Sequence, residues 1–190
     1  MTRAYKPDPV PPLVLTDLVE LASRAPSAGK TQGWHLVVLQ GEDTAKFWGI
    51  TFPHDERDDF PWPHLLDAPV IALPLADPQA YLDRYSSDDK AESGLGDSTE
   101  SWPVAYWTVD TAMSVNTFLL AAEDAGLGAL FFGVFHDEAA MRTGLGIPEH
   151  LELLGAIALG YRADGANLPP KLSHRPRRRL PEQIIHFGGW

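Results

Sequence analysis

The chain has 190 residues, of which 44% are hydrophobic and 22% are charged, and both values are ordinary for a globular domain. Fifteen basic residues against 26 acidic ones give a formal net charge of -11. This charge argues against general nucleic-acid binding, which requires a basic surface. The chain has no cysteine, so disulfides, thiol catalysis and thiolate metal sites are excluded. A redox enzyme of this composition needs a bound organic cofactor to carry its electrons.

The length favours a single domain over residues 1–190, with an extended arm at 1–12 and a C-terminal extension at 171–190. We expect variable loops at 51–68 and 86–101. The N-terminus lacks the apolar core of a signal peptide, and no segment approaches about 18 unbroken apolar residues. We therefore expect a cytoplasmic protein without a membrane partner.

The arm at 1–12 is predicted to be extended, because its four prolines preclude a regular helix. An amphipathic helix is predicted next, since apolar residues recur at three- and four-residue spacing from Leu15 to Ala25. Pro26 ends the helical hydrogen-bond ladder, and the apolar run at 34–39 predicts a strand.

The connection between this helix and this strand, residues 25–33, is rich in small residues and in N–H and O–H donors. It contains two glycines, which allow backbone conformations that are closed to other residues. Such a loop can lay its backbone against a flat ligand with polar edges. The same composition also suits an ordinary helix–strand turn, so spacing alone leaves both interpretations open.

Residues 42–48 predict a short helix, and the proline-containing segment 51–68 predicts an irregular connection. His54 and His64 lie among carboxylates there, but they lack the i, i+4 spacing of a helical metal site. We therefore predict a solvated loop and no metal site. With its tryptophan, Trp62, the segment is also a candidate lid.

The continuous apolar run at 68–75 predicts a buried strand, in which Pro74 indicates an edge or a bulge. Asp77 and Pro78 then predict a capped helix that continues to about residue 85. The polar, acidic segment at 86–101 predicts a mobile connection.

The longest predicted helix covers 107–125, and its small residues permit close approach of another helix. A glycine-containing turn and a strongly apolar strand follow at 126–135, and a further strand is predicted at 153–161. Five of the 15 basic residues fall in the final 20 positions. One short basic cluster in so acidic a chain fits a small anion, such as one phosphate, better than nucleic acid.

Residues 24–34, R-A-P-S-A-G-K-T-Q-G-W, resemble the A-P-S-x-x-N-x-Q-P-W signature of the nitroreductase family of FMN-dependent oxidoreductases. Lys30 stands where that family usually has Asn, and Gly33 where it usually has Pro. Four other segments resemble the family in the same order. They are the arm, the G-L-G strand at 126–135, the L-G-I-P turn at 145–148 and the R-x-R…H…W ending at 177–190.

The resemblance implies an α+β fold with a mixed central sheet surrounded by helices. It further implies an intertwined homodimer, in which the C-terminal strand of each chain joins the sheet of the partner subunit. Two FMN sites would lie at the dimer interface, each built from both chains. The helix at 107–125 would be central to that interface and would also serve as a core helix.

Four segments supply the cofactor-binding residues that the resemblance implies. They are Arg3 of the arm, Pro26, Ser27, Ala28, Lys30 and Gln32 of the loop, Phe131, Phe132 and Gly133 of the strand, and Arg177 and Arg179 of the ending.

Arg3 corresponds to the last arginine of the family's opening motif, whose preceding Arg and Ser are absent here. It is either a donor to the cofactor phosphate or an exposed arginine near a terminus. Arg177 and Arg179 alternate on an extended segment and can point the same way toward the phosphate. The backbone N–H near Gly133 would donate to flavin N5.

The implied chemistry is ping-pong: NADH or NADPH reduces FMN and leaves, and an electron-poor acceptor such as a nitroaromatic or a quinone then takes its place. The resemblance calls for no catalytic acid or base. Lys30 adds a positive charge that would favour anionic reduced flavin. Two alternatives stay open. One is a non-catalytic flavin-binding or storage protein, and the other is a specialised enzyme of this fold, for flavin fragmentation, reductive dehalogenation or deazaflavin chemistry.

Overall fold

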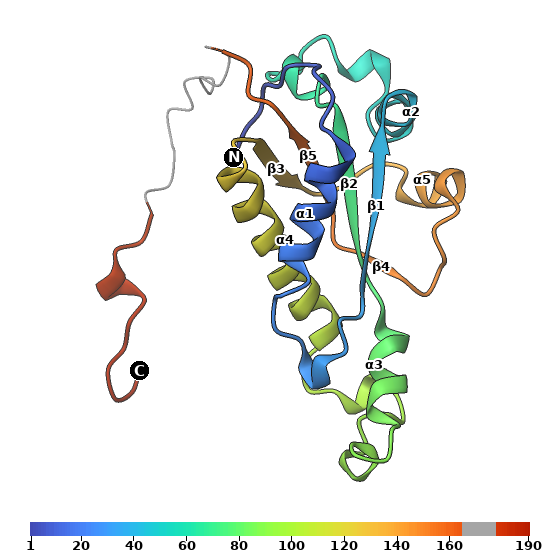
Figure 1. The fold of residues 1–190 in the computed structure, drawn as a ribbon, viewed down its shortest axis with the longest axis vertical. Coiled ribbons are helices and arrows are strands. Elements are labelled where there is room, and N and C mark those ends of the chain that lie inside the picture. Colours follow the sequence, from blue (N-terminus) through green and yellow to red (C-terminus); the bar gives the residue numbers. More distant parts are fainter. Residues whose placement is uncertain (165–177) are drawn as a thin grey trace.

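The computed structural model describes residues 1–164 and 178–190, and its body is a sheet with helices on both faces (Figure 1). The strands are β1 (Trp34–Gln40), β2 (Val70–Ala76), β3 (Gly128–Phe132), β4 (Glu152–Leu153) and β5 (Ala156–Gly160). Their order is β1-β2-β5-β3, with β4 beside β2. The expected α+β class is confirmed, and every strand pair that the described residues form is antiparallel.

The α-helices are α1 (Pro12–Ala22), α2 (Glu42–Thr51), α3 (Pro78–Tyr85), α4 (Tyr106–Asp124) and α5 (Glu138–Leu145). α1 and α4 cover one face of the sheet, and α2 and α5 pack against the other, while α3 lies beyond its end (Figure 1). α1 ends at Ala22 and not at Ala25, because the chain tightens there into a turn in which Ala25 N–H donates to Ala22 O. No helix in the two described ranges is long and apolar enough to cross a membrane.

β2 is the centre of the core, and every one of its residues is buried. Successive side chains of a strand point to opposite faces. Val70 and Ala72 accordingly pack with α1 and α4, whereas Ile71 and Leu73 pack with α2 and α5. A strand covered on both faces has no polar positions, which accounts for its uninterrupted apolar run.

Pro74 lies inside β2, which is not an edge strand because strands flank it on both sides. The strand has β1 on one side and β4 and β5 on the other. The chain on that second side is interrupted at residues 154–155, between β4 and β5, and Leu154 N–H donates to Pro74 O over 3.1 Å. The missing N–H of the proline therefore lies at a break in the ladder, where it costs no strand–strand hydrogen bond.

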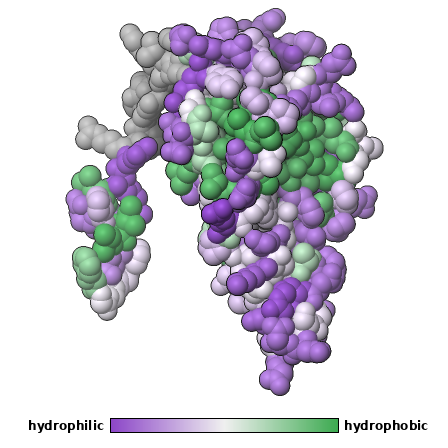
Figure 2. All heavy atoms as spheres, viewed as in Figure 1, coloured by the Kyte–Doolittle hydropathy of each residue, from purple (hydrophilic) through white to green (hydrophobic). Residues whose placement is uncertain are grey.

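α4 buries a mainly aromatic and polar stripe, which consists of Trp107, Asp110, Thr111, Ser114, Val115, Phe118 and Ala122. Several apolar residues lie on its outer side, and Val109 and Leu120 are 39% and 64% exposed. Further exposed apolar residues lie on the face that carries α1 and β1, where Figure 2 shows a green area. The helix thus has a core side and an uncovered apolar side.

The N-terminal arm packs on the sheet and is not a free end. Thr2 N–H donates to Ala129 O at 3.0 Å, and the buried Tyr5 hydroxyl donates to Ala158 O at the same distance. Burial raises the pKa of Tyr5 well above its ordinary value. Arg3 lies between two buried residues and is itself half-buried. The expectation of an exposed arginine near the terminus is therefore wrong.

Residues 178–190 are all exposed, and their regular structure is the 3-10 turn Pro181–Gln183. Figure 1 shows this segment apart from the sheet. These residues form no strand within one chain, so the pairing of a C-terminal strand with a partner's sheet stays a prediction.

Candidate functional site

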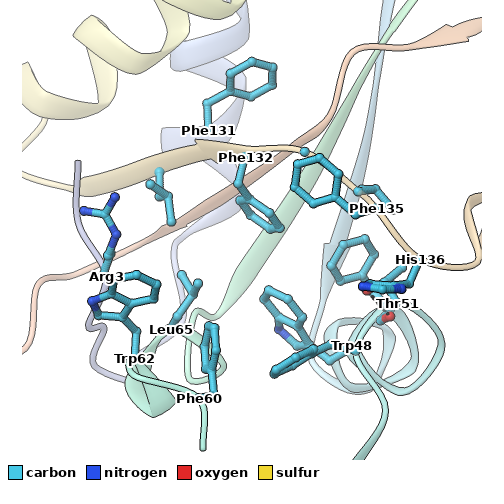
Figure 3. Close-up of a pocket in the computed structure, with 15 residues that line it drawn as sticks. Arg3, Trp48, Thr51, Phe60, Trp62, Leu65, Phe131, Phe132, Phe135 and His136 are labelled. Carbon is cyan, nitrogen blue, oxygen red and sulfur yellow. Dashed lines mark hydrogen bonds between the residues drawn. The ribbon is translucent and has the colours of Figure 1, made fainter. Parts of the chain in front are cut away.

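An open cavity of about 400 Å³ lies between the arm, α2, the loop at 51–68 and the end of β3 (Figure 3). Its lining comes from Arg3, from residues 47–52, 60–65 and 130–136, and is mostly aromatic and aliphatic. These segments meet because the arm runs beside β3 on one side of the cavity, while α2 lies on the other side of the cavity. The cavity is therefore built from four separate parts of the chain.

Aromatic rings form the walls of this cavity. Trp48 and Phe132 are stacked almost parallel, with an interplanar angle of 7° and ring centroids 5.7 Å apart. Phe60 meets Trp62 edge to face, with centroids 5.8 Å apart. Arg57 fixes the loop that carries these rings, because Nη2 donates to Trp48 O and Phe52 O, each over 2.8 Å. The candidate lid segment thus supplies part of the cavity wall.

The cavity brings together four residues that the sequence predicts to bind a cofactor. The Arg3 guanidinium lies over the Trp62 ring, 5.1 Å from its centroid. In Figure 3 the Phe132 ring points toward the cavity, while Phe131 points away from it toward the helices. Phe131 packs in the core on the α1 and α4 side, as the alternation of a strand requires. The peptide of Gly133 continues the wall next to Phe132.

The loop at 25–33 lies elsewhere, at the opposite end of α1 and close to α3 (Figure 1). None of its residues lines the cavity. One hydrogen bond within the loop and one to the end of α1 hold its conformation: Gln32 N–H donates to Ser27 Oγ at 3.0 Å, and Gln32 Nε2 donates to Ser23 O at 2.7 Å. Pro26, Gln32 and Lys30 are exposed there. The predicted loop residues are thus close to one another but far from Arg3 and Phe132.

Three residues that the sequence analysis did not single out support this loop through hydrogen bonds. Asp110 is 4% exposed, and its Oδ2 accepts the Ala28 N–H at 2.7 Å and the Tyr81 hydroxyl at 2.8 Å. Burial and this hydrogen bond raise the pKa of Tyr81 well above its ordinary value. Arg84 Nε donates to Gly29 O at 2.9 Å.

A sequence signal for Asp110 did exist. Trp107, Thr111 and Phe118 repeat at helical spacing and mark the buried stripe, and Asp110 is a charged residue in that stripe. A charged residue on a core face is rarely buried without partners.

The remaining predicted positions lie outside the cavity. Arg177 is outside the described residues, and Arg179 is exposed and donates to Gln183 O within its own turn. His64 Nδ1 lies 2.9 Å from Asp67 Oδ2. No group of three or more possible metal ligands occurs among residues 1–164 and 178–190.

Known proteins share this architecture. The sequence model of the nitroreductase family matches residues 1–161 of the chain. An NADH dehydrogenase of Thermus thermophilus is 28% identical over 201 residues, which cover 96% of this chain and 89% of the relative.

Two solved structures have the same fold. A nitroreductase-like protein of Streptococcus mutans superposes with a TM-score of 0.76 at 18% identity. The match covers 97% of this chain and 92% of that protein's chain. An FMN-dependent nitroreductase of Clostridium difficile superposes with a TM-score of 0.65 at 19% identity. The match covers 100% of this chain and 94% of that protein's chain. Since the family match spans most of its length, the chain belongs to the nitroreductase family of oxidoreductases.

Proposed function

We propose that the chain is an FMN-dependent oxidoreductase, driven by NADH or NADPH, that reduces electron-poor aromatic acceptors such as nitroaromatics and quinones. The observation that carries this proposal is the aromatic cavity, which gathers Arg3, Phe132 and Gly133 beside each other in a member of the nitroreductase family. The name of the relative from Thermus thermophilus supports NADH as a donor. The name of the structural neighbour from Clostridium difficile supports FMN.

The residues of the cavity fit a flat ring system with an acidic group. The volume of about 400 Å³ lies in the ordinary range of small-molecule sites. Its aromatic walls offer flat apolar surfaces, while Arg3 offers charge-assisted donors. Gly133 has no side chain that could come between its backbone N–H and a ligand, and the Phe135 ring packs where its Cβ would lie. Bound FMN would supply hydride transfer, and the chain would bind and orient its ring.

The separation of the loop at 25–33 from the cavity supports a homodimer, in which each FMN site takes the cavity of one protomer and the loop of its partner. The apolar outer side of α4, with Val109 and Leu120 exposed, offers a surface for the second copy. β1 is an edge strand of the sheet, flanked by an open groove at Val19 and Val38. The C-terminal segment of a partner would extend the sheet at this edge.

An absorbance spectrum of the purified protein, followed by anaerobic addition of NADH and then NADPH, tests this function. We expect a flavin band near about 450 nm that bleaches with one or both nucleotides. Absence of bound flavin, together with no uptake of added FMN, would contradict the proposal.

Flavin that dithionite reduces, but that neither NADH nor NADPH reduces, would support a flavin-binding protein without this activity. The stacked Trp48 and Phe132 rings favour this second candidate, because they would leave little room for a nucleotide beside a bound ring. Activity with a nitroaromatic such as 4-nitrobenzoate then separates the two functions.

A further inference from the structure

The loop at 25–33 has a strained backbone. Gly29, Lys30 and Gln32 all have positive φ angles, of 61°, 54° and 51°. Residues other than glycine adopt this region uncommonly, and each such residue costs about 1–3 kcal/mol. A strained conformation persists only where surrounding groups determine it, and such conformations cluster at ligand-binding sites.

Asp110 is the buried group that holds the start of the strained turn. Its Oδ2 accepts the N–H of Ala28, the first residue of the 3-10 turn Ala28–Lys30. Among the described residues, no lysine or arginine forms an ion pair with Asp110. The carboxylate is instead stabilised by donors, namely this N–H and the Tyr81 hydroxyl. Hydrogen bonds to an ionised acceptor are stronger than those between neutral groups.

Tyr81 and Arg84, both on α3, complete the support. The Tyr81 ring packs on Gly33, where an added Cβ would lie 2.7 Å from the ring. The Gly33 that departs from the family's usual proline thus makes room for the ring whose hydroxyl reaches Asp110. Arg84 holds Gly29 O through Nε, and its two terminal nitrogens are paired with Asp89 at 2.7 and 2.8 Å.

We propose that Asp110 is a positioning residue for the cofactor loop. Its carboxylate, oriented by Tyr81, holds the Ala28 peptide so that the loop at 25–33 keeps the strained conformation that receives the ligand. This inference rests on the proposed function, because it assumes that the loop of one protomer contacts FMN. Asp110 itself is a buried residue of α4 and acts through the Ala28 backbone.

The test compares Asp110→Ala and Asp110→Asn with the wild-type protein. A matched control is Asp124→Asn, which changes the exposed last residue of the same helix. FMN affinity is measured by titration, the placement of the bound ring by visible circular dichroism, and loop order by the rate of tryptic cleavage after Lys30 relative to Lys46 in α2.

We expect Asp110→Ala to weaken FMN binding by about tenfold or more, since a hydrogen bond to a charged group is lost. Cleavage after Lys30 should accelerate and the dichroism of the bound flavin should change. Asp110→Asn keeps the shape and one acceptor oxygen, so it should recover part of the affinity. Asp124→Asn should match the wild type in all three measurements.

Two outcomes overturn the inference. Wild-type FMN affinity, flavin dichroism and Lys30 cleavage in Asp110→Ala would show that the carboxylate does not position the loop, while the proposed function stands. Failure of the wild-type protein to bind FMN would overturn the proposed function together with this inference. If Asp110→Ala does not fold, Asp110→Asn is judged by the same three measurements, with an expected loss of affinity smaller than tenfold but above that of the control.

Discussion

The aromatic cavity and the loop at 25–33 are built on opposite physical principles. The cavity is formed by ring faces such as those of Trp48 and Phe132, which contact one another without hydrogen bonds. The loop is held by directed hydrogen bonds, three of which connect Ala28, Gly29 and Gln32 to groups outside or at the edge of the loop. One region presents apolar area, and the other presents a fixed backbone.

This difference indicates how each region should respond to change. Apolar area contributes in proportion to the surface buried, so the cavity should lose stability when a ring is removed. A hydrogen-bonded backbone depends on geometry, so the loop should be sensitive to small shifts of its supports. The two regions should therefore fail separately, and variants can be chosen to damage one while leaving the other intact.

The largest effect should come from Trp48→Ala in the cavity wall. Trp48 is 7% exposed and packs against Phe47 and Phe132, so its removal should lower the free energy of unfolding by about 3–5 kcal/mol. Urea denaturation measures this change. Phe135→Ala, at a ring that is 87% exposed, should change the same quantity by less than about 0.5 kcal/mol. Equal effects in the two variants would mean that Trp48 is not part of the core.

A smaller loss should follow from Gly33→Ala in the loop region. The new Cβ would lie 2.7 Å from the Tyr81 ring, and the required shift should cost about 1–3 kcal/mol in unfolding free energy. Gly49→Ala on α2, where nothing lies within 4 Å of the new Cβ, should instead stabilise the protein by about 0.5–1 kcal/mol. The comparison fails if the two substitutions have the same sign.

Alkaline pH should weaken the support of the loop through Tyr81, whose pKa is raised in the folded state. The unfolded tyrosine loses its proton at a lower pH, near about 10, so the unfolded state then binds fewer protons. Stability from this group is full below about pH 10 and falls above it, by up to about 1.4 kcal/mol per pH unit.

Denaturation curves between pH 8 and about 11.5 measure this slope. Tyr81→Phe should reduce the slope and leave the share of Tyr5, whose pKa is also raised by burial. Tyr106→Phe, at a residue that is 39% exposed, should leave the slope as in the wild type. An unchanged slope in Tyr81→Phe would contradict the assignment of this titration to Tyr81.

The smallest effect should come from Lys30→Asn. Asparagine tolerates a positive φ better than lysine does, and Lys30 has a φ of 54°, so stability should rise by up to about 1 kcal/mol. Loss of the positive charge should also make the potential of bound flavin more negative. Lys46→Asn on α2 removes the same charge outside the loop and should leave the potential unchanged, and equal potentials in both variants would exclude a role of the Lys30 charge.

The sequence was most informative where side-chain periodicity or a motif determines the structure. The apolar run of β2 and the cap of α3 by Asp77 follow from local rules, and Asp77 Oδ1 accepts the Ala80 N–H as predicted. The motifs predict Arg3 and Phe132 as cofactor-binding residues, and both line the cavity. The opposite directions of Phe131 and Phe132 follow from strand alternation, which the motif alone did not take into account.

Other features depend on contacts between distant parts of the chain. Asp110 meets Ala28 across 82 positions, and no local pattern specifies that pairing. The buried side of α4 was hard to identify because apolar residues also cover its outer side, as with Val109 and Leu120. A proline in an apolar run predicts an edge or a bulge, because the residues around Pro74 do not show that the chain opposite it is interrupted between β4 and β5.

The packing of the arm has a consequence for the order in which the molecule folds. Tyr5 contacts Ala158 across 153 positions, and Thr2 contacts Ala129. During synthesis the arm emerges well before its partners in β3 and β5. Contacts of such long sequence separation form slowly, because loop closure precedes any gain from them. Arg3 therefore reaches the cavity only after β5 has been made, so we expect a nascent or truncated chain that lacks β5 to have no ligand-binding cavity.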